Sequence, residues 1–325
     1  MSGNSQESRV RVDLTAVVIA VREGDPHVLT VDRLDEAAIA LPSGPLQQGH
    51  RSLQAGLRNW VETQTQCRLG YVEQLYTFGD RIPSHLGSER PTEHHAISIA
   101  YLTLVPMPED NVPVQGRWRP WYAFFPWEDR RSGEPASGLP MVEALRKWTT
   151  PTARPQDRAF VEPARLTFGL NGSPWDEERA LERYEMLYEA ELVPEAAADR
   201  RLEPKAGIKN LPGIPMFADH RRILATAISR LRAKIKYRPV LFELMPASFT
   251  LSALQKTAEA LSGVPLHTQN FRRLVLQQGL VEETGEIAAD TGGRPAKMMR
   301  FRREATLERP APGVRVRATR RASYP

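Results

Sequence analysis

The chain has 325 residues, of which 41% are hydrophobic and 26% charged, values typical of a globular protein with one large domain or two ordinary ones. It lacks any run near the roughly 18 apolar residues of a membrane span and, near its N-terminus, the apolar core of a signal peptide. Its single cysteine, Cys67, excludes an internal disulfide and a cysteine-rich metal site. We therefore expect a cytoplasmic protein without membrane contact.

The formal net charge of +5 is unevenly distributed along the chain. Residues 217–325 contain 20 Lys and Arg against 9 Asp and Glu, a net charge of +11. Residues 1–216 contain 24 against 30, a net charge of −6. A basic C-terminal part beside an acidic N-terminal part indicates that the former binds a polyanion. The alternative is a basic surface that is merely solvated.

The N-terminal third predicts a sheet with one helix. The apolar stretch from Val12 predicts a buried strand that ends at the turn 24–26, and residues 27–33 predict its hairpin partner. An apolar stripe at helical spacing predicts a helix over 52–64. Further strands are predicted at 71–80, 96–105 and 121–127.

Residues 128–210 are rich in Pro, Glu and Arg, and we interpret them as a partly ordered insertion. Within them, Ser173 is a candidate N-cap for a helix from about Pro174 to Leu192. The next helix, 217–237, combines an apolar face with a face that we expect to be basic. The latter contains Arg221, Arg222, Arg230, Arg232, Lys234 and Lys236.

The stretch 249–302 predicts two short helices joined by a tight turn and followed by a basic hairpin. Thr250 is a candidate N-cap of the first helix, which Gly263 and Pro265 end. The second helix is expected from Thr268 to about Gln278. Helix, turn, helix and hairpin in this order are typical of winged helix-turn-helix DNA-binding domains.

The second of these helices has two different faces. Phe271, Leu274 and Val275 point toward the first helix, whereas polar side chains point outward and suit the major groove, because Arg can bind guanine and Gln adenine. The candidate DNA-contacting residues are Thr268, Gln269, Asn270, Arg272, Arg273 and Gln277 on this helix, and Arg294 and Lys297 on the hairpin. The acidic residues Glu282, Glu283, Glu286 and Asp290 have to face away from DNA.

The segment LPSGPLQQGHRSLQAGLRNWVETQTQCRL resembles a Nudix box. Gly44, Arg58, Trp60 and Glu62 match the pattern, whereas His50, Asn59 and Thr63 stand in place of its glutamates and Thr65 in place of its last glycine. Nudix hydrolases hold Mg²⁺ or Mn²⁺ through carboxylates of this helix, and a single carboxylate is a poor site for such cations. The resemblance therefore implies that hydrolysis is lost, with no catalytic residue and no metal ligand retained.

The degenerate Nudix box, NFRR of the second helix and GRPAK of the hairpin occur together and in this order. The combination resembles the NrtR-like, Nudix-related transcriptional regulators of NAD metabolism. It implies an α+β fold in which a Nudix-like α/β/α sandwich precedes a winged helix-turn-helix domain. We expect an effector-sensing domain at 10–237 with the insertion at about 128–210 and the connecting helix at 217–237, a DNA-binding domain at 238–304, and a disordered basic tail at 305–325.

The resemblance also implies a function. It predicts a homodimeric repressor of NAD biosynthesis or salvage genes that binds a palindromic operator in double-stranded DNA. The effector is ADP-ribose, NAD or a related nucleotide, and no cofactor is expected. Candidate effector-binding residues are Arg33, Gly44, Arg58, Glu62, Phe78, Asp80 and Arg81.

Three alternatives remain open. The first is a Nudix hydrolase acting on a nucleoside diphosphate-linked substrate such as ADP-ribose, with Glu62 aided by His50 or Glu73. The second is an RNA-binding or scaffolding protein, and the third a Nudix-like domain kept only as a structural or dimerisation module. We expect His94, His95 and His220 to be surface or capping groups rather than metal ligands, because they have no cysteine partner.

Overall fold

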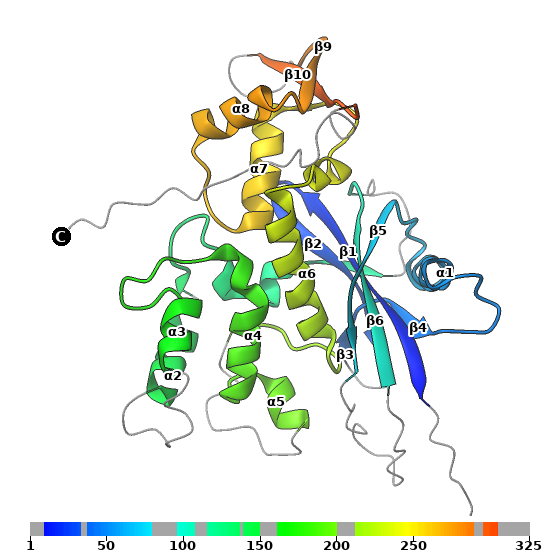
Figure 1. Cartoon of the computed structure of the whole chain (residues 1–325), viewed down its shortest axis with the longest axis vertical. Coiled ribbons are helices and arrows are strands. Elements are labelled where there is room, and N and C mark those ends of the chain that lie inside the picture. The colour runs from blue at the N-terminus through cyan, green and yellow to red at the C-terminus, as the bar shows by residue number, and fades with distance from the viewer. Residues whose placement is uncertain are drawn as a thin grey trace, which may run out of the picture.

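The structure is a computed structural model. It describes residues 10–33, 38–79, 96–107, 116–136, 139–149, 161–199, 212–288 and 295–304. An N-terminal sheet carries helices on both faces, further helices lie beside it, and a small C-terminal domain stands at one end (Figure 1). Within the described ranges, no helix is both long and apolar enough to cross a membrane.

The main sheet has seven strands. They are β1 (Arg11–Arg22), β2 (Asp25–Arg33), β3 (Ala38–Ala40), β4 (Ser43–Pro45), β5 (Tyr71–Phe78), β6 (Ala96–Leu104) and β7 (Arg117–Pro120). The strand order is β3-β2-β1-β6-β5, with β4 paired to β1 and β7 paired to β2. β1 and β6 are parallel and the other pairs are antiparallel. The predicted hairpin of the first two strands is confirmed.

Helices cover both faces of this sheet, which explains the unbroken apolar run of β1. On one face, α1 (Leu53–Thr65) packs Leu57 and Val61 into a small core with alternate β1 residues. On the other face, α6 (His220–Ile235) contributes to a larger core that also includes Val17 and Ile19. The side chains from Leu14 to Ala20 are therefore all buried.

The strand predicted at 121–127 is wrong. The strand in this region is β7, and two 3-10 turns follow it, η1 (Trp121–Ala123) and η2 (Pro126–Glu128). Pro126 begins the second turn and has no N–H for a ladder hydrogen bond. Four bulky apolar residues of this segment are buried in the larger core, namely Trp121, Phe124, Phe125 and Trp127.

The region that we interpret as an insertion is largely helical where it is described. Its elements are α2 (Leu139–Trp148), α3 (Val161–Thr167), η5 (Glu177–Arg179), α4 (Ala180–Glu189) and α5 (Pro194–Asp199). The predicted helix therefore starts later than Pro174, and Asp176 rather than Ser173 caps the turn before it by accepting from the Glu178 N–H at 3.0 Å. α4 packs along α6, and the larger core runs continuously from the sheet through these helices (Figure 1).

The face of α6 that we predicted to be basic is only partly a solvated surface. Arg221 and Arg232 are buried, because each has a buried acidic partner outside α6. Arg221 lies 3.3 Å from the Glu195 carboxylate of α5 and also donates to the Phe124 carbonyl. The predicted apolar face is confirmed by the burial of Ile223, Leu224, Ala227, Ile228 and Leu231.

His220 is a buried structural residue, so of its two expected roles, surface group or capping group, the surface role is wrong. Its Nδ1 accepts a hydrogen bond from the Leu41 N–H at 2.8 Å and so connects the first turn of α6 with the sheet. Burial, with a smaller contribution from Arg33, lowers its pKa from 6.5 to about 3. His94 and His95 lie outside the described residues.

The low pKa of His220 predicts a loss of stability in mild acid. Below about pH 6.5 the His220 imidazole is protonated in the unfolded chain, but in the folded chain it stays neutral down to about pH 3. The free energy of unfolding therefore decreases as the pH is lowered through this window. We expect His220→Asn to be less stable at pH 7 but to lose roughly 1.4 kcal/mol less per pH unit between pH 6 and 4. Urea titrations over this range measure the two slopes. Equal slopes would contradict the assignment.

The C-terminal domain has the predicted winged helix-turn-helix order. It comprises β8 (Phe249–Thr250), α7 (Leu251–Ser262), α8 (Thr268–Gln277), β9 (Val281–Ala288) and β10 (Ala296–Phe301), with the strands in the order β8-β10-β9. Thr250 caps α7 by accepting from the Ala253 N–H at 3.1 Å, and Gly263 ends it at φ +72°. The α+β fold class is confirmed. Residues 305–325, predicted to be a disordered tail, lie outside the described residues.

Candidate nucleic-acid interface and effector region

The outward face of α8 is polar and basic. Phe271 and Val275 are buried against the domain. The exposed residues, which we call the outward face, are Thr268, Gln269, Arg272, Arg273, Leu276 and Gln277. Five of these six were predicted from the sequence as candidate DNA-contacting residues, and the sixth candidate on this helix, Asn270, is half-buried. α8 has two arginines and no acidic residue, which favours a polyanion.

The start of α8 is held by a buried amide on α7. The Gln255 side-chain amide donates to the Leu266 carbonyl at 3.2 Å and to the Thr268 hydroxyl at 3.1 Å. It also reaches the Glu259 carboxylate, which accepts from the Leu266 N–H at 2.9 Å. These contacts fix the turn between the two helices, so the outward face has one orientation relative to α7.

Both arginines of the outward face are oriented by neighbouring side chains. Arg273 donates to Gln277 at 2.9 Å and to Asn270 at 2.8 Å, and Arg272 donates to Ser252 of α7 at 2.9 Å. These hydrogen bonds lie at the exposed surface of the domain, so they are weak enough to be exchanged for others. Thus α8 presents two oriented guanidinium groups on one helical face.

The β9–β10 hairpin places basic and acidic side chains together. Lys297 lies 2.8 Å from Glu283, and Arg300 lies 2.6 Å from Glu282. Two of the four acidic residues expected to face away from DNA, Glu282 and Glu283, therefore neutralise part of the hairpin's charge. Because exposed ion pairs contribute little free energy, Lys297 can exchange Glu283 for a phosphate. Arg294 and Asp290 lie outside the described residues.

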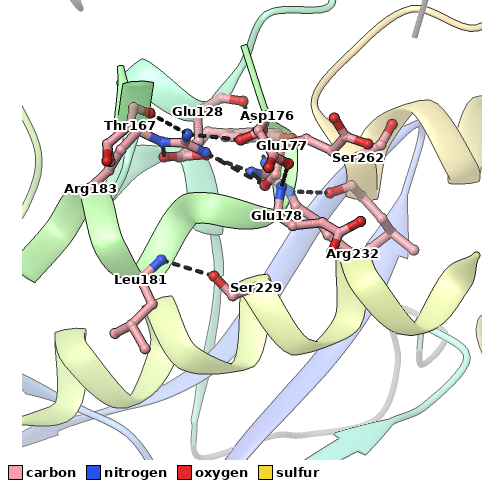
Figure 2. Close-up of polar contacts among 12 residues, drawn as sticks. Glu128, Thr167, Asp176, Glu177, Glu178, Leu181, Arg183, Ser229, Arg232 and Ser262 are labelled. Carbon is pink, nitrogen blue, oxygen red and sulfur yellow. Dashed lines mark hydrogen bonds and ion pairs between the residues drawn. The ribbon is translucent and has the colours of Figure 1, made fainter. Parts of the chain in front are cut away.

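A buried ionic network connects α7 with the rest of the molecule (Figure 2). Glu128 is fully buried and pairs with Arg183 of α4, at 2.5 and 2.8 Å, and with Arg232 of α6. Arg232 also donates to the Leu261 carbonyl in the last turn of α7 at 2.9 Å. We call Glu128, Arg183 and Arg232 the buried triad. It joins η2, α4, α6 and α7 at one point.

The pKa of Glu128 reflects its two partners. Burial raises it, but attraction and hydrogen bonds from Arg183 and Arg232 outweigh burial, and the net direction is downward. Glu128 is therefore a carboxylate at neutral pH. The indole of Trp175 lies between two guanidinium groups, with Arg130 and Arg183 each 3.7 Å from the ring centroid.

The end of α7 meets this network closely. The Arg130 N–H donates to the Gly263 carbonyl at 2.7 Å, and the Tyr122 hydroxyl donates to the Ala260 carbonyl at 2.7 Å. A Cβ on Gly263 would lie 2.3 Å from the Glu128 carbonyl oxygen, so the site excludes any side chain. Arg131 extends the connection to the β1–β2 turn through the Gly24 carbonyl at 2.6 Å.

The matching residues of the Nudix-like segment lie around α1. Ser52 caps this helix by accepting from the Ala55 N–H at 3.1 Å. Arg58 donates to the carbonyls of Leu69 and Gly70 and so binds α1 to the loop before β5. Glu62 is exposed, and its carboxylate lies 3.6 Å from Arg68.

Close packing against the Trp60 side chain explains why position 44 is a glycine. A Cβ there would lie 2.3 Å from the indole of Trp60, whose Nε1 donates to the Pro45 carbonyl at 2.9 Å. The glycine lets β4 approach α1 closely. At the position where the Nudix pattern has a glutamate, the His50 ring lies edge-on to Trp60 at 6.4 Å, and its Nδ1 accepts from the Gln47 N–H.

The other described residues that were predicted to bind the effector do not lie beside α1. Phe78 belongs to the larger core on the opposite face of the sheet from α1. Arg33 stacks on the Phe217 ring at 4.3 Å, just before α6. The structure thus brings Gly44, Arg58 and Glu62 to one side of the sheet and leaves Arg33 and Phe78 apart from them. Asp80 and Arg81 lie outside the described residues.

The residues that the structure describes form a Nudix-like α/β domain followed by a winged helix. Residues 241–301 match the family model described as the NrtR DNA-binding winged helix domain. This range contains α7, α8 and both hairpin strands. In the described ranges, no group of three or more His, Cys, Asp or Glu side chains is arranged to hold a metal ion.

The chain resembles one known repressor in part of its sequence and a solved regulator in its fold. The chain is 40% identical over 83 residues to the ADPR responsive transcriptional repressor NtrR of Acinetobacter baylyi, a match over 26% of this chain and 33% of that protein. The chain thus spans about a third of the length of this curated relative. The crystal structure of Shewanella oneidensis NrtR complexed with a 27mer DNA matches with a TM-score of 0.53 and 18% identity, over 91% of this chain and 95% of that one. The structure of the same protein described without DNA matches with a TM-score of 0.52 over 90% and 95%.

Two features of the interface were missed from the sequence. Leu276 is not among the residues predicted to contact DNA, yet it is 51% exposed beside the arginines. The i, i+3 and i+4 spacing to Arg272 and Arg273 carried that information. The contacts of Gln255 were not predictable, because its partners come from the turn 11 and 13 residues later.

Proposed function

We propose that this protein is a DNA-binding transcriptional repressor whose Nudix-like domain senses ADP-ribose or a related nucleotide. The observation that carries the proposal is the outward face of α8, two oriented arginines and two glutamines on a segment that matches NrtR winged helix domains. The candidate contacts are Thr268, Gln269, Asn270, Arg272, Arg273, Gln277, Arg294 and Lys297.

The ADP-ribose assignment is supported by the matched repressor, whose name describes it as responsive to ADPR. Glu62 is the one carboxylate left among the glutamate positions of the Nudix pattern, and it is exposed beside Arg68. One carboxylate is a poor site for Mg²⁺, so we infer a domain that binds a nucleotide without hydrolysing it. Gly44, Arg58 and Glu62 are the effector candidates that share one side of the sheet.

The repressor acts as a homodimer in this proposal. A winged helix of this size reads one half-site, and two copies related by a two-fold axis read a palindrome. The genes it controls belong to NAD biosynthesis or salvage, as the resemblance of the sequence implies. The domain limits at 10–237 and 238–304 are part of the same proposal.

Mobility-shift titrations at physiological salt test the output half of the proposal. The duplexes are promoters of NAD-synthesis genes and the best sequence selected from a random library, with a scrambled duplex as the competitor. We expect retention of the specific duplex at concentrations at least a thousandfold below those that retain the scrambled one. Equal affinity for all duplexes, or none, would refute sequence-selective binding.

Thermal-shift measurements with ADP-ribose, NAD, nicotinamide nucleotides and ATP test the sensing half. A ligand present at 100 times its Kd is expected to add about 2.7 kcal/mol to the unfolding free energy. Release of AMP from ADP-ribose in the presence of Mn²⁺, abolished by Glu62→Gln, would instead support the hydrolase.

A further inference from the structure

An apolar side chain lies within the basic outward face of α8. Leu276 is 51% exposed and stands one helical turn after Arg272 and Arg273, on the same face of the helix. In the part of the C-terminal domain that the structure describes, the other large apolar side chain this exposed is Ile287, on β9.

Leu276 contributes little to the fold in this position. Its neighbours Phe271 and Val275 are buried and hold α8 against the domain, whereas Leu276 leaves half of its surface in water. Leucine is a strong helix former, but a charged or polar helix former at this exposed site would serve as well and be better solvated. The flanking arginines favour an anionic partner over a second apolar protein surface.

Duplex DNA offers one apolar group where an outward helix residue meets it. The C5-methyl group of thymine projects into the major groove, beside the donors and acceptors that Arg and Gln read. If the arginines enter the groove, Leu276 enters it with them, because all three project from adjacent turns of one face.

We propose that Leu276 is a specificity-determining residue that contacts the C5-methyl group of a thymine in each operator half-site. This inference rests on the proposed DNA-binding function. Leu276 thereby adds an apolar contact to the hydrogen bonds of the arginines and glutamines. It distinguishes thymine from cytosine and from uracil, neither of which carries this methyl group.

Uracil substitution tests the proposal without changing base pairing. In the operator selected from a random library, each thymine is replaced in turn by uracil, and Kd is measured by fluorescence anisotropy. At the contacted position we expect wild-type protein to bind the uracil duplex about fourfold more weakly, equivalent to about 0.8 kcal/mol for one buried methyl group. Leu276→Ala and Leu276→Gln are expected to bind both duplexes equally.

The matched control is Leu139→Ala, which removes a leucine of similar exposure, 49%, at the start of α2. It is expected to keep the wild-type Kd and the fourfold difference. The proposal is overturned if no uracil substitution weakens wild-type binding, if the Leu276 variants retain the difference, or if the selected half-site contains no thymine. In each of these cases selective operator binding still stands. A library that yields no preferred sequence overturns the DNA-binding function itself.

Discussion

Replacing Glu128 by alanine is expected to lower the free energy of unfolding by about 3–5 kcal/mol, because it leaves two buried guanidinium groups without their shared counter-ion. Arg183 and Arg232 are both almost fully buried, so water cannot replace the carboxylate. Their remaining hydrogen bonds are to neutral groups, including the backbone carbonyls of Thr167 and Leu261 and the Tyr122 hydroxyl, which do not neutralise the charge.

Equilibrium urea unfolding measures this loss, and Glu134→Ala is the matched control. Glu134 also pairs with an arginine, Arg130 at 3.5 Å, but its side chain is 55% exposed. Because exposed ion pairs contribute about 0–1 kcal/mol, the control is expected to change the stability only slightly. Equal losses in the two variants would show that the buried triad has no special role.

The second large effect is expected at the outward face of α8. Arg272→Ala and Arg273→Ala should each weaken operator binding by about 1–3 kcal/mol if the arginine reads a base, equivalent to roughly 5- to 150-fold in Kd. An arginine that contacts phosphate instead should weaken all duplexes similarly and lower the salt dependence by about one counter-ion. Because both side chains are exposed, the stability of the protein should barely change.

Anisotropy titrations with specific and scrambled duplexes at several salt concentrations separate these cases. Arg146→Ala removes an exposed arginine of α2 and controls for the loss of one positive charge. It is expected to bind like wild type. If both α8 variants bind the operator normally, α8 is not the recognition helix.

The elements that local patterns determine were predictable. The apolar run of β1, the stripe of α1 and the caps Thr250 and Gly263 each depend on residues a few positions apart. These signals gave the sheet, the first helix and the winged helix in the correct order.

The predictions that were wrong mostly concern residues whose partners lie far away along the chain. Arg232 was predicted only as part of a basic face, and its burial could not be foreseen because its acidic partner, Glu128, lies 104 residues earlier. His220 accepts a hydrogen bond from Leu41, which lies 179 residues earlier in the chain. The segment after Pro120 forms a 3-10 turn, and its sequence has no alternating pattern from which this turn could be predicted. The candidate effector-binding residues lie on both faces of the sheet, because a linear sequence pattern does not show which face a side chain occupies.

Nucleotide binding in one domain is expected to change DNA binding in the other, and paired titrations measure this coupling. Operator Kd is measured with and without saturating ADP-ribose, and ADP-ribose Kd with and without saturating operator. We expect both dissociation constants to change by the same factor, about 5- to 150-fold, since coupling between two sites is reciprocal. Operator affinity that stays the same at saturating ADP-ribose would contradict this expectation.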